Sequence, residues 1–206
     1  MSVRFHEAFS IDSARRQFNF SDHFLGDSLR DLWAVGGGAG GSAVVVDAQD
    51  GGVLRITTDG DTNDVYFIDW NDIRSFHVDK KVTMEFRIKV EDKDNSVLYA
   101  GLLYDVNNRI VFYNNGGAIR TTNGGTATSE VSGHTQDNDY HIYRIECFPA
   151  GEVHFYIDGV ETANSPITTD IPSDAGDYLQ PYFYIRTSED VEHYVDLDYV
   201  VVRQEI

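Results

Sequence analysis

The stretch Val82-Thr-Met-Glu-Phe-Arg-Ile-Lys-Val90 constrains the fold more than any other part of the chain. Apolar and polar side chains alternate throughout it, a period of two that suits a strand with one buried face and one solvated face. The sequence contains no amphipathic helical pattern longer than about three turns. The chain therefore lacks the helices that usually connect parallel strands, and an antiparallel sandwich or barrel is expected.

Other alternating or apolar runs predict further strands, and clusters of Gly, Asn and Asp between them predict turns. Residues 36–41, Gly-Gly-Gly-Ala-Gly-Gly, are typical of a flexible connection. The dipeptide Asp158-Gly159 predicts a tight hairpin. Together these signals place predicted strands at residues 43–46, 53–58, 82–90, 97–104, 109–113, 141–148, 152–157, 180–186 and 194–202.

Composition supports a folded β-protein and argues against several classes of partner. The chain of 206 residues is 41% hydrophobic and 13% aromatic, enough for a sizeable core. Its formal net charge of −18 repels phosphate backbones and anionic headgroups, so neither nucleic acid nor a membrane is expected as a partner. Cys147 is the single cysteine, which excludes an intrachain disulfide and a zinc–thiolate cluster, and we expect it to fill core space.

Residues 139–159 are the most informative segment. They run Asp-Tyr-His-Ile-Tyr-Arg-Ile-Glu-Cys-Phe-Pro-Ala-Gly-Glu-Val-His-Phe-Tyr-Ile-Asp-Gly, two strands joined by a Pro-Ala-Gly turn and closed by Asp-Gly. With the closing segment Tyr-Val-Asp-Leu-Asp-Tyr-Val-Val-Val-Arg at 194–203 and the opening Phe-Leu-Gly-Asp-Ser-Leu-Arg-Asp-Leu-Trp at 24–33, the chain resembles the concanavalin A-like lectin/glucanase superfamily. That superfamily includes laminin G-like modules and family 16 glycoside hydrolases. The resemblance implies a jelly-roll β-sandwich but leaves enzymes, lectins and scaffolds all open.

The motif for catalysis in family 16 is missing. Those hydrolases carry Glu-x-Asp-x-(x)-Glu on one strand, which places two catalytic carboxylates on the same face. Here Glu85 stands alone, with Arg87 and Lys89 where further acids would follow. The nucleophile elbow Gly-x-Ser-x-Gly is also missing from the sequence. We therefore expect no catalytic residues.

Sugar binding in a fold of this kind would use aromatic rings on the concave sheet. Alternation within residues 152–157 and 180–186 selects outward-facing aromatic and polar side chains. Further candidates for the same face are Tyr99, Leu103 and the pair Tyr66 and Trp70. Tyrosine also lines half-buried sheets simply because it packs well across strands, so the ordinary interpretation remains open. The candidate glycan-binding residues are Tyr99, His154, Tyr156, Tyr182, Tyr184 and Arg186.

A calcium site is the one metal site that the sequence suggests. The run Asp59-Gly-Asp-Thr-Asn-Asp64 places Asp59, Asp61 and Asp64 in a short loop, and oxygen ligands suit a hard cation. The resemblance implies a structural calcium held by an aspartate of the last strand, where Asp198 or Asp196 matches. The alternative is an ordinary solvated turn in an acidic protein. No other cofactor is expected.

Residues 1–20 differ from the rest of the chain, because they combine aromatic and basic side chains. We predict an attachment arm here and a jelly-roll domain at 21–206. The residues predicted to dock on a partner are Arg4, Phe5, Phe9, Arg15, Arg16, Phe18 and Phe20.

The N-terminal sequence has no secretory signal, so we expect synthesis in the cytoplasm. These features predict a non-catalytic structural or decoration protein of a larger assembly, such as the capsid or tail surface of a bacteriophage virion. Its partners would be capsid or tail proteins, further copies of itself, or a glycan on the concave face. The alternatives are a lectin-like carbohydrate-binding module and a polysaccharide hydrolase or lyase.

Overall fold

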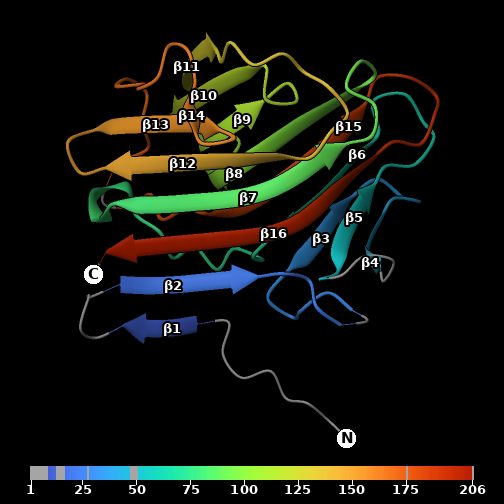
Figure 1. The fold of residues 1–206 in the computed structure, drawn as a ribbon, viewed down its shortest axis with the longest axis horizontal. Helices are drawn as coiled ribbons and strands as arrows, with labels where there is room; N and C mark the ends of the chain where they lie inside the picture. The colour runs from blue at the N-terminus through green and yellow to red at the C-terminus, as the bar shows by residue number, and fades with distance from the viewer. Residues whose placement is uncertain (1–8, 13–16, 27, 47–50, 175, 206) are drawn as a thin grey trace, which may run out of the picture.

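The computed structural model describes residues 9–12, 17–26, 28–46, 51–174 and 176–205. These residues form two antiparallel sheets, of nine and seven strands, that pack face to face as a sandwich (Figure 1). The predicted all-β jelly roll is therefore confirmed. The helical segment within the described ranges is one turn, η1 (Val78–Lys80), and none of their helices is long and apolar enough to cross a membrane.

The nine-stranded sheet lies at the front of Figure 1, where β2, β16, β7 and β12 run side by side. Its main path, in spatial order, is β1 (Phe9–Asp12), β2 (Gln17–Asp22), β16 (Tyr194–Glu205), β7 (Val82–Val90), β12 (His141–Phe148), β13 (Glu152–Ile157) and β14 (Val160–Glu161). Two further strands, β4 (Ser42–Val46) and β5 (Val53–Thr57), pair with each other, and β5 pairs with the start of β16.

The seven-stranded sheet packs behind the first. Its spatial order is β11 (Thr126–Val131), β10 (Ala118–Asn123), β9 (Asn108–Tyr113), β8 (Ser96–Asp105), β15 (Gln180–Thr187), β6 (Val65–Asp69) and β3 (Ala34–Gly37). Strands β3, β6, β10 and β11 were missing from the sequence-based prediction. In particular, Gly36 and Gly37 are not a flexible connection but part of β3, where a Cβ on Gly36 would lie 2.5 Å from Cζ of Phe67.

The core lies between the two sheets and is rich in aromatic rings. Strand β7 alternates buried and half-buried residues along its whole length, as its sequence predicts. Phe86 of β7 contacts Phe183 of β15 with ring centroids 5.1 Å apart, and Phe155 of β13 contacts Phe112 of β9 at 5.3 Å. Both contacts join one sheet to the other. Cys147 is fully buried, as expected.

The proposed boundary between arm and domain at residue 20 is wrong, because β2 is an internal strand of the nine-stranded sheet and pairs with β16. Phe20 is only 1% exposed and its ring centroid lies 4.5 Å from that of Trp70, while Phe18 packs against Phe76 at 5.7 Å. Phe20 is therefore a core residue and not a docking residue, and Phe18 is half-buried and packs against the core. Phe9 begins β1, and Arg4, Phe5, Arg15 and Arg16 lie outside the described residues.

Candidate functional site

Four of the predicted glycan-binding residues share one surface, the outer face of the seven-stranded sheet. Tyr99 lies on β8, whereas Tyr182, Tyr184 and Arg186 lie on the neighbouring strand β15. Side chains alternate along a strand, and the residues between these four belong to the core. Those core neighbours are Leu98, Ala100, Phe183 and Ile185.

An unbroken row of aromatic side chains crosses this face, and we call it the aromatic band. It consists of Tyr113 on β9, Tyr99 on β8, Tyr184 on β15 and Phe67 on β6, each directly opposite the next in the strand register. Ring centroids of Tyr99 and Tyr113 are 4.8 Å apart, and those of Tyr99 and Tyr184 are 5.2 Å apart. Four adjacent strands span about 14 Å, so the band is wider than a single ring.

Tyr182 lies beside the aromatic band but is only 9% exposed, so it supports the band and adds little accessible surface. Tyr182 lies two residues before Tyr184, and its ring centroid is 6.1 Å from that of Tyr184 and 5.9 Å from that of Phe67. The rings of the band itself are half-buried, so part of each remains open to solvent. Gly101, the residue opposite Tyr182 on β8, contributes no side chain. This surface therefore presents accessible ring faces and edges together with hydroxyl groups.

Three arginines lie on the same face. The guanidinium carbon of Arg109 is 4.9 Å from the ring centroid of Tyr99, and that of Arg120 is 4.5 Å from the ring centroid of Tyr113. Both distances are within the range of cation–π attraction. Arg186 follows Tyr184 by two residues on β15 and so points to the same side of the sheet.

The hydroxyls of Tyr99, Tyr182 and Tyr184 keep their protons at neutral pH. Burial raises the pKa of Tyr99, and the neighbouring Tyr113 raises it further, although Arg109, Arg120 and Arg186 all act in the opposite direction. Burial likewise raises the pKa of Tyr182 and of Tyr184. A neutral phenol can both donate and accept a hydrogen bond, as recognition of a hydroxylated ligand requires.

The other two predicted glycan-binding residues lie on the opposite side of the molecule. His154 and Tyr156 belong to β13 and point outward from the nine-stranded sheet, so the predicted set does not form one site. Nδ1 of His154 lies 2.6 Å from Oε1 of Glu161. The guanidinium carbon of Arg144 lies 4.2 Å from the ring centroid of Tyr156.

The two outer faces differ in how their arginines are neutralised. On the nine-stranded sheet, Arg55 forms a bidentate pair with Asp196 at 2.8 Å, Arg87 pairs with Asp198 at 2.6 Å, and Arg144 lies 3.1 Å from Glu146. On the seven-stranded sheet, no ion pair joins any of its three arginines to a carboxylate of the described chain. They are Arg109, Arg120 and Arg186.

The predicted calcium ligands occupy two separate places. In the loop after β5, Oδ1 of Asp59 accepts a hydrogen bond from the amide of Asp61, and Oδ2 of Asp64 accepts one from the amide of Asp59. Asp198 instead lies on β16, paired with Arg87. The carboxylates of Asp59 and Asp64 therefore cap backbone amides, as in an ordinary turn, and the calcium site stays an untested alternative.

A different set of potential metal ligands is close together. Within the described ranges, ligand atoms of Asp92, Glu189 and His193 all lie within 4.8 Å of one another. Both ring nitrogens of His193 already face carboxylates, Nδ1 at 3.2 Å from Glu91 and Nε2 at 3.1 Å from Glu189. This arrangement satisfies the histidine through hydrogen bonds without an ion.

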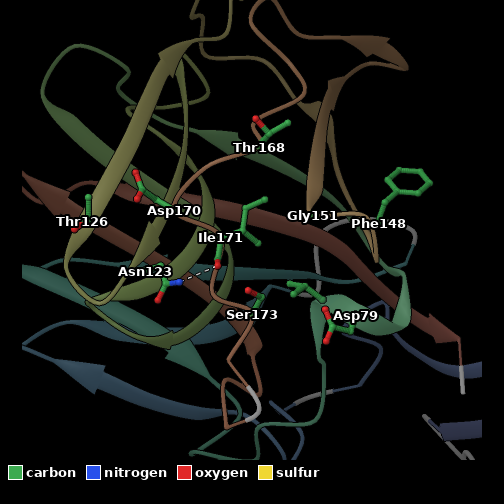
Figure 2. Close-up of a pocket in the computed structure, with 10 residues that line it drawn as sticks. Asp79, Asn123, Thr126, Phe148, Gly151, Thr168, Asp170, Ile171 and Ser173 are labelled. Carbon is green, nitrogen blue, oxygen red and sulfur yellow. Dashed lines mark hydrogen bonds between the residues drawn. The ribbon is translucent and has the colours of Figure 1, made fainter.

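A pocket of about 320 Å³ opens at one end of the sandwich (Figure 2). The turn of the β10–β11 hairpin, the turn between β12 and β13, η1 and residues 168–173 form its walls, and Nδ2 of Asn123 donates a hydrogen bond to the carbonyl of Ile171. Figure 2 shows its two carboxylates, Asp79 and Asp170, standing apart with Ile171 between them. They do not form a carboxylate pair, and none of the predicted site residues lines this pocket.

Comparison with known proteins identifies the fold. No protein-family model matches the chain, and no curated protein sequence matches it. Rv0315 of Mycobacterium tuberculosis, an immunostimulatory antigen and pseudo beta-1,3-glucanase, aligns with a TM-score of 0.65 and 17% identity over 91% of this chain and 98% of its own. A family 16 endo-glucanase from Bacteroides ovatus aligns with a TM-score of 0.62 and 12% identity over 88% of this chain and 98% of its own.

The carbohydrate recognition domain of Emp47p aligns with a TM-score of 0.61 and 11% identity over 96% of this chain and 97% of its own. These three structures share the concanavalin A-like jelly roll, and the chain has the same fold. The resemblance expected from residues 139–159 and 194–203 is thus confirmed at the level of fold. A place in a virion stays a prediction.

Proposed function

We propose that the protein is a carbohydrate-binding, lectin-like module and that the outer face of its seven-stranded sheet receives the glycan. The observation that carries this proposal is the aromatic band, in which Tyr113, Tyr99, Tyr184 and Phe67 lie opposite one another on four adjacent strands. Pyranose rings present apolar C–H faces that stack on aromatic rings, and their hydroxyls pair with phenols and guanidinium groups. A band about 14 Å wide suits several linked sugars better than one.

The likenesses to a carbohydrate recognition domain and to glucanases support this proposal, because such domains handle glycans on the same fold. They do not select the sugar. The residues of the band come from four strands that the sheet holds rigidly in register. The face is therefore preorganised, which limits the conformational entropy that binding would cost.

We further propose that the module binds its glycan without cleaving it. Glycoside hydrolysis needs two carboxyl groups no more than about 9.5 Å apart. On the described strands of the proposed face the carboxylates are Asp69 of β6 and Asp105 at the end of β8, and their places in the register put them on the order of 15 Å apart. Glu85 lies on the other sheet, where its Oε1 accepts a hydrogen bond from the hydroxyl of Tyr199 at 3.0 Å.

The experiment is a screen of the full chain against a glycan array, followed by calorimetric titration of the best ligand with wild type and two variants. Tyr99→Ala removes the ring at the centre of the band, and we expect at least tenfold weaker binding, equivalent to about 1.4 kcal/mol. Tyr156→Ala is the matched control, because it removes a tyrosine that also lies beneath an arginine, but on the other sheet. Absence of any bound glycan, or equal weakening by both variants, would overturn the proposal.

A further inference from the structure

The arginines of the proposed face form no ion pair with a carboxylate of the described chain, although the protein has 34 acidic and 16 basic residues. In a chain with such an excess of acidic residues, a carboxylate is readily available as the ion-pair partner of an arginine. The other outer face shows this, since Arg55, Arg87 and Arg144 each have one. Among the described residues of that other face, Arg203 and Lys89 also form no ion pair, so the difference is that none of the three arginines beside the aromatic band has one.

Part of this charge is also withdrawn from solvent. The Nε atoms of Arg109 and Arg186 are buried and have no hydrogen-bond partner among the described residues. The Nε of Arg144 on the other sheet also lacks a hydrogen bond, but it has the carboxylate of Glu146 at 3.1 Å as a counter-charge. A guanidinium that is partly desolvated and unpaired raises the free energy of the folded protein, and an anion that pairs with it recovers that cost. Arginine also matches carboxylate and sulfate groups geometrically, through its fork of N–H donors.

The register places these charges on both sides of the aromatic band. Arg186 lies two residues from Tyr184 along its strand, which is one step between side chains on the same face. Arg120 lies one step from the band in the opposite direction, because it faces Val111, the residue two before Tyr113. Arg109 lies one step further that way, on β9. A polymer stacked along the band would therefore have guanidinium groups beside both of its edges.

We infer that this face selects acidic glycans, polymers whose sugars carry carboxylate or sulfate groups. The inference rests on the proposed carbohydrate-binding function and adds the class of ligand. The net charge of the protein does not prevent it, because physiological salt screens exposed charges beyond about 8 Å, whereas close, partly buried pairs are screened much less.

The test compares polymers that differ only in charge. Polygalacturonate is titrated against its fully methyl-esterified form, and dextran sulfate against dextran, with the full-length protein and calorimetric detection. We expect wild type to bind the acidic member of at least one pair at least tenfold more tightly than its neutral match. Preference in only the first pair identifies a uronate ligand, preference in only the second identifies a sulfated one, and preference in both identifies charge as the shared feature.

Two variants locate the preference. The double variant Arg109→Gln with Arg186→Gln should lose the preference for the acidic polymer while it still binds the neutral one weakly. Arg144→Gln, which removes the arginine over Tyr156 on the other sheet, should keep the preference. Circular dichroism of each variant confirms folding, and the comparison of polymers with wild type needs no variant at all.

Different results would overturn the acidic-glycan inference and the proposed function. Equal affinity of wild type for charged and neutral polymers would overturn the acidic-glycan inference and leave carbohydrate binding standing. Loss of the preference in Arg144→Gln would also overturn it, since the charge responsible would then lie on the other face. Failure to bind any of these polymers or any glycan of the array would overturn the proposed function itself.

Discussion

Replacement of Phe20 by alanine tests whether the N-terminal region belongs to the domain. The ring of Phe20 is 1% exposed, and its centroid lies 4.5 Å from that of Trp70 and 6.2 Å from that of Trp33. Its strand, β2, pairs with β16 in the interior of the sheet. The substitution therefore leaves a cavity among aromatic rings that the surrounding strands cannot easily close.

The expected cost is large compared with the stability of a domain. Phenylalanine-to-alanine substitutions in protein cores cost about 3–5 kcal/mol, because transfer free energy is lost and the cavity remains. Domains are stable by only about 5–15 kcal/mol in total. For a chain of this length each kcal/mol shifts the melting temperature by about 2–4 °C, so Phe20→Ala should lower it by roughly 6–20 °C.

Thermal and urea unfolding, followed by circular dichroism, measure the effect. Phe148→Ala is the control, because that ring is only half-buried and lies near the turn that ends β12, so its loss should cost far less. If Phe20→Ala melted within about 2 °C of wild type, the packing argument would fail. Phe20 would then be assigned to the predicted docking arm and not to the core.

Three further expectations concern metal, pH and chemistry. Because the carboxylates of loop 59–64 already cap backbone amides, removing calcium with a chelator at constant ionic strength should leave the melting temperature unchanged, and a drop of several degrees would contradict this. Burial lowers the pKa of His141, but the contacts of its ring with Asp158 and Asp137 outweigh burial and raise the pKa in the folded protein. The stabilisation that these contacts give is therefore complete below the pKa of His141 in the unfolded chain, and it is lost as pH rises through the pKa in the folded protein. His141→Gln should therefore cost more stability at pH 6 than at pH 9, and a constant difference in melting temperature would refute this. No new reducing ends should appear when the protein is incubated with any polymer that it binds, and their steady release would show an enzyme.

Local patterns in the sequence predict nine of the sixteen described strands, and within those nine they predict the direction of the side chains. The strands not predicted are β1, β2, β3, β6, β10, β11 and β14. The period of two in residues 82–90 reproduces the burial of β7 position by position. The hairpin predicted at Asp158-Gly159 joins β13 to β14, and both residues have positive φ, 51° and 80°, as a tight turn of this type requires. These features depend on neighbours in the chain, so no tertiary information is needed to predict them.

The assignment of a strand to one sheet or the other depends on tertiary contacts. Alternation shows that Tyr156 and Tyr184 both point away from the core, but not that they lie on opposite faces of the molecule. Arg109 and Tyr113 were missed although their strand was predicted, because the alternation of 109–113 was not used to select outward residues. Tyr66 and Trp70 were also candidates for the glycan-binding face. On β6, however, the neighbouring Phe67 is the residue that faces outward, and Trp70 belongs to the core.

Phe18 and Phe20 show a similar failure. They alternate with polar residues in Gln17–Asp22, the pattern of a half-buried strand, but the arginines of the N-terminal region suggested an arm. The partner of this strand is β16, at the far end of the sequence. A single short strand whose partner is so distant is hard to distinguish from an exposed tail by composition alone.

The contrast between the two outer faces links the fold to the proposed function. A β-sandwich turns about half of its strand residues outward on two surfaces, and stability alone favours neutralising the charges on both. The nine-stranded sheet does so for three of its arginines, with ion pairs at Arg55, Arg87 and Arg144. The seven-stranded sheet keeps Arg109 and Arg186 without such partners in the described chain, beside half-exposed aromatic rings. The free protein is less stable with these arginines unpaired than it would be with them paired. A ligand that brings the missing negative charge recovers this difference in free energy when it binds.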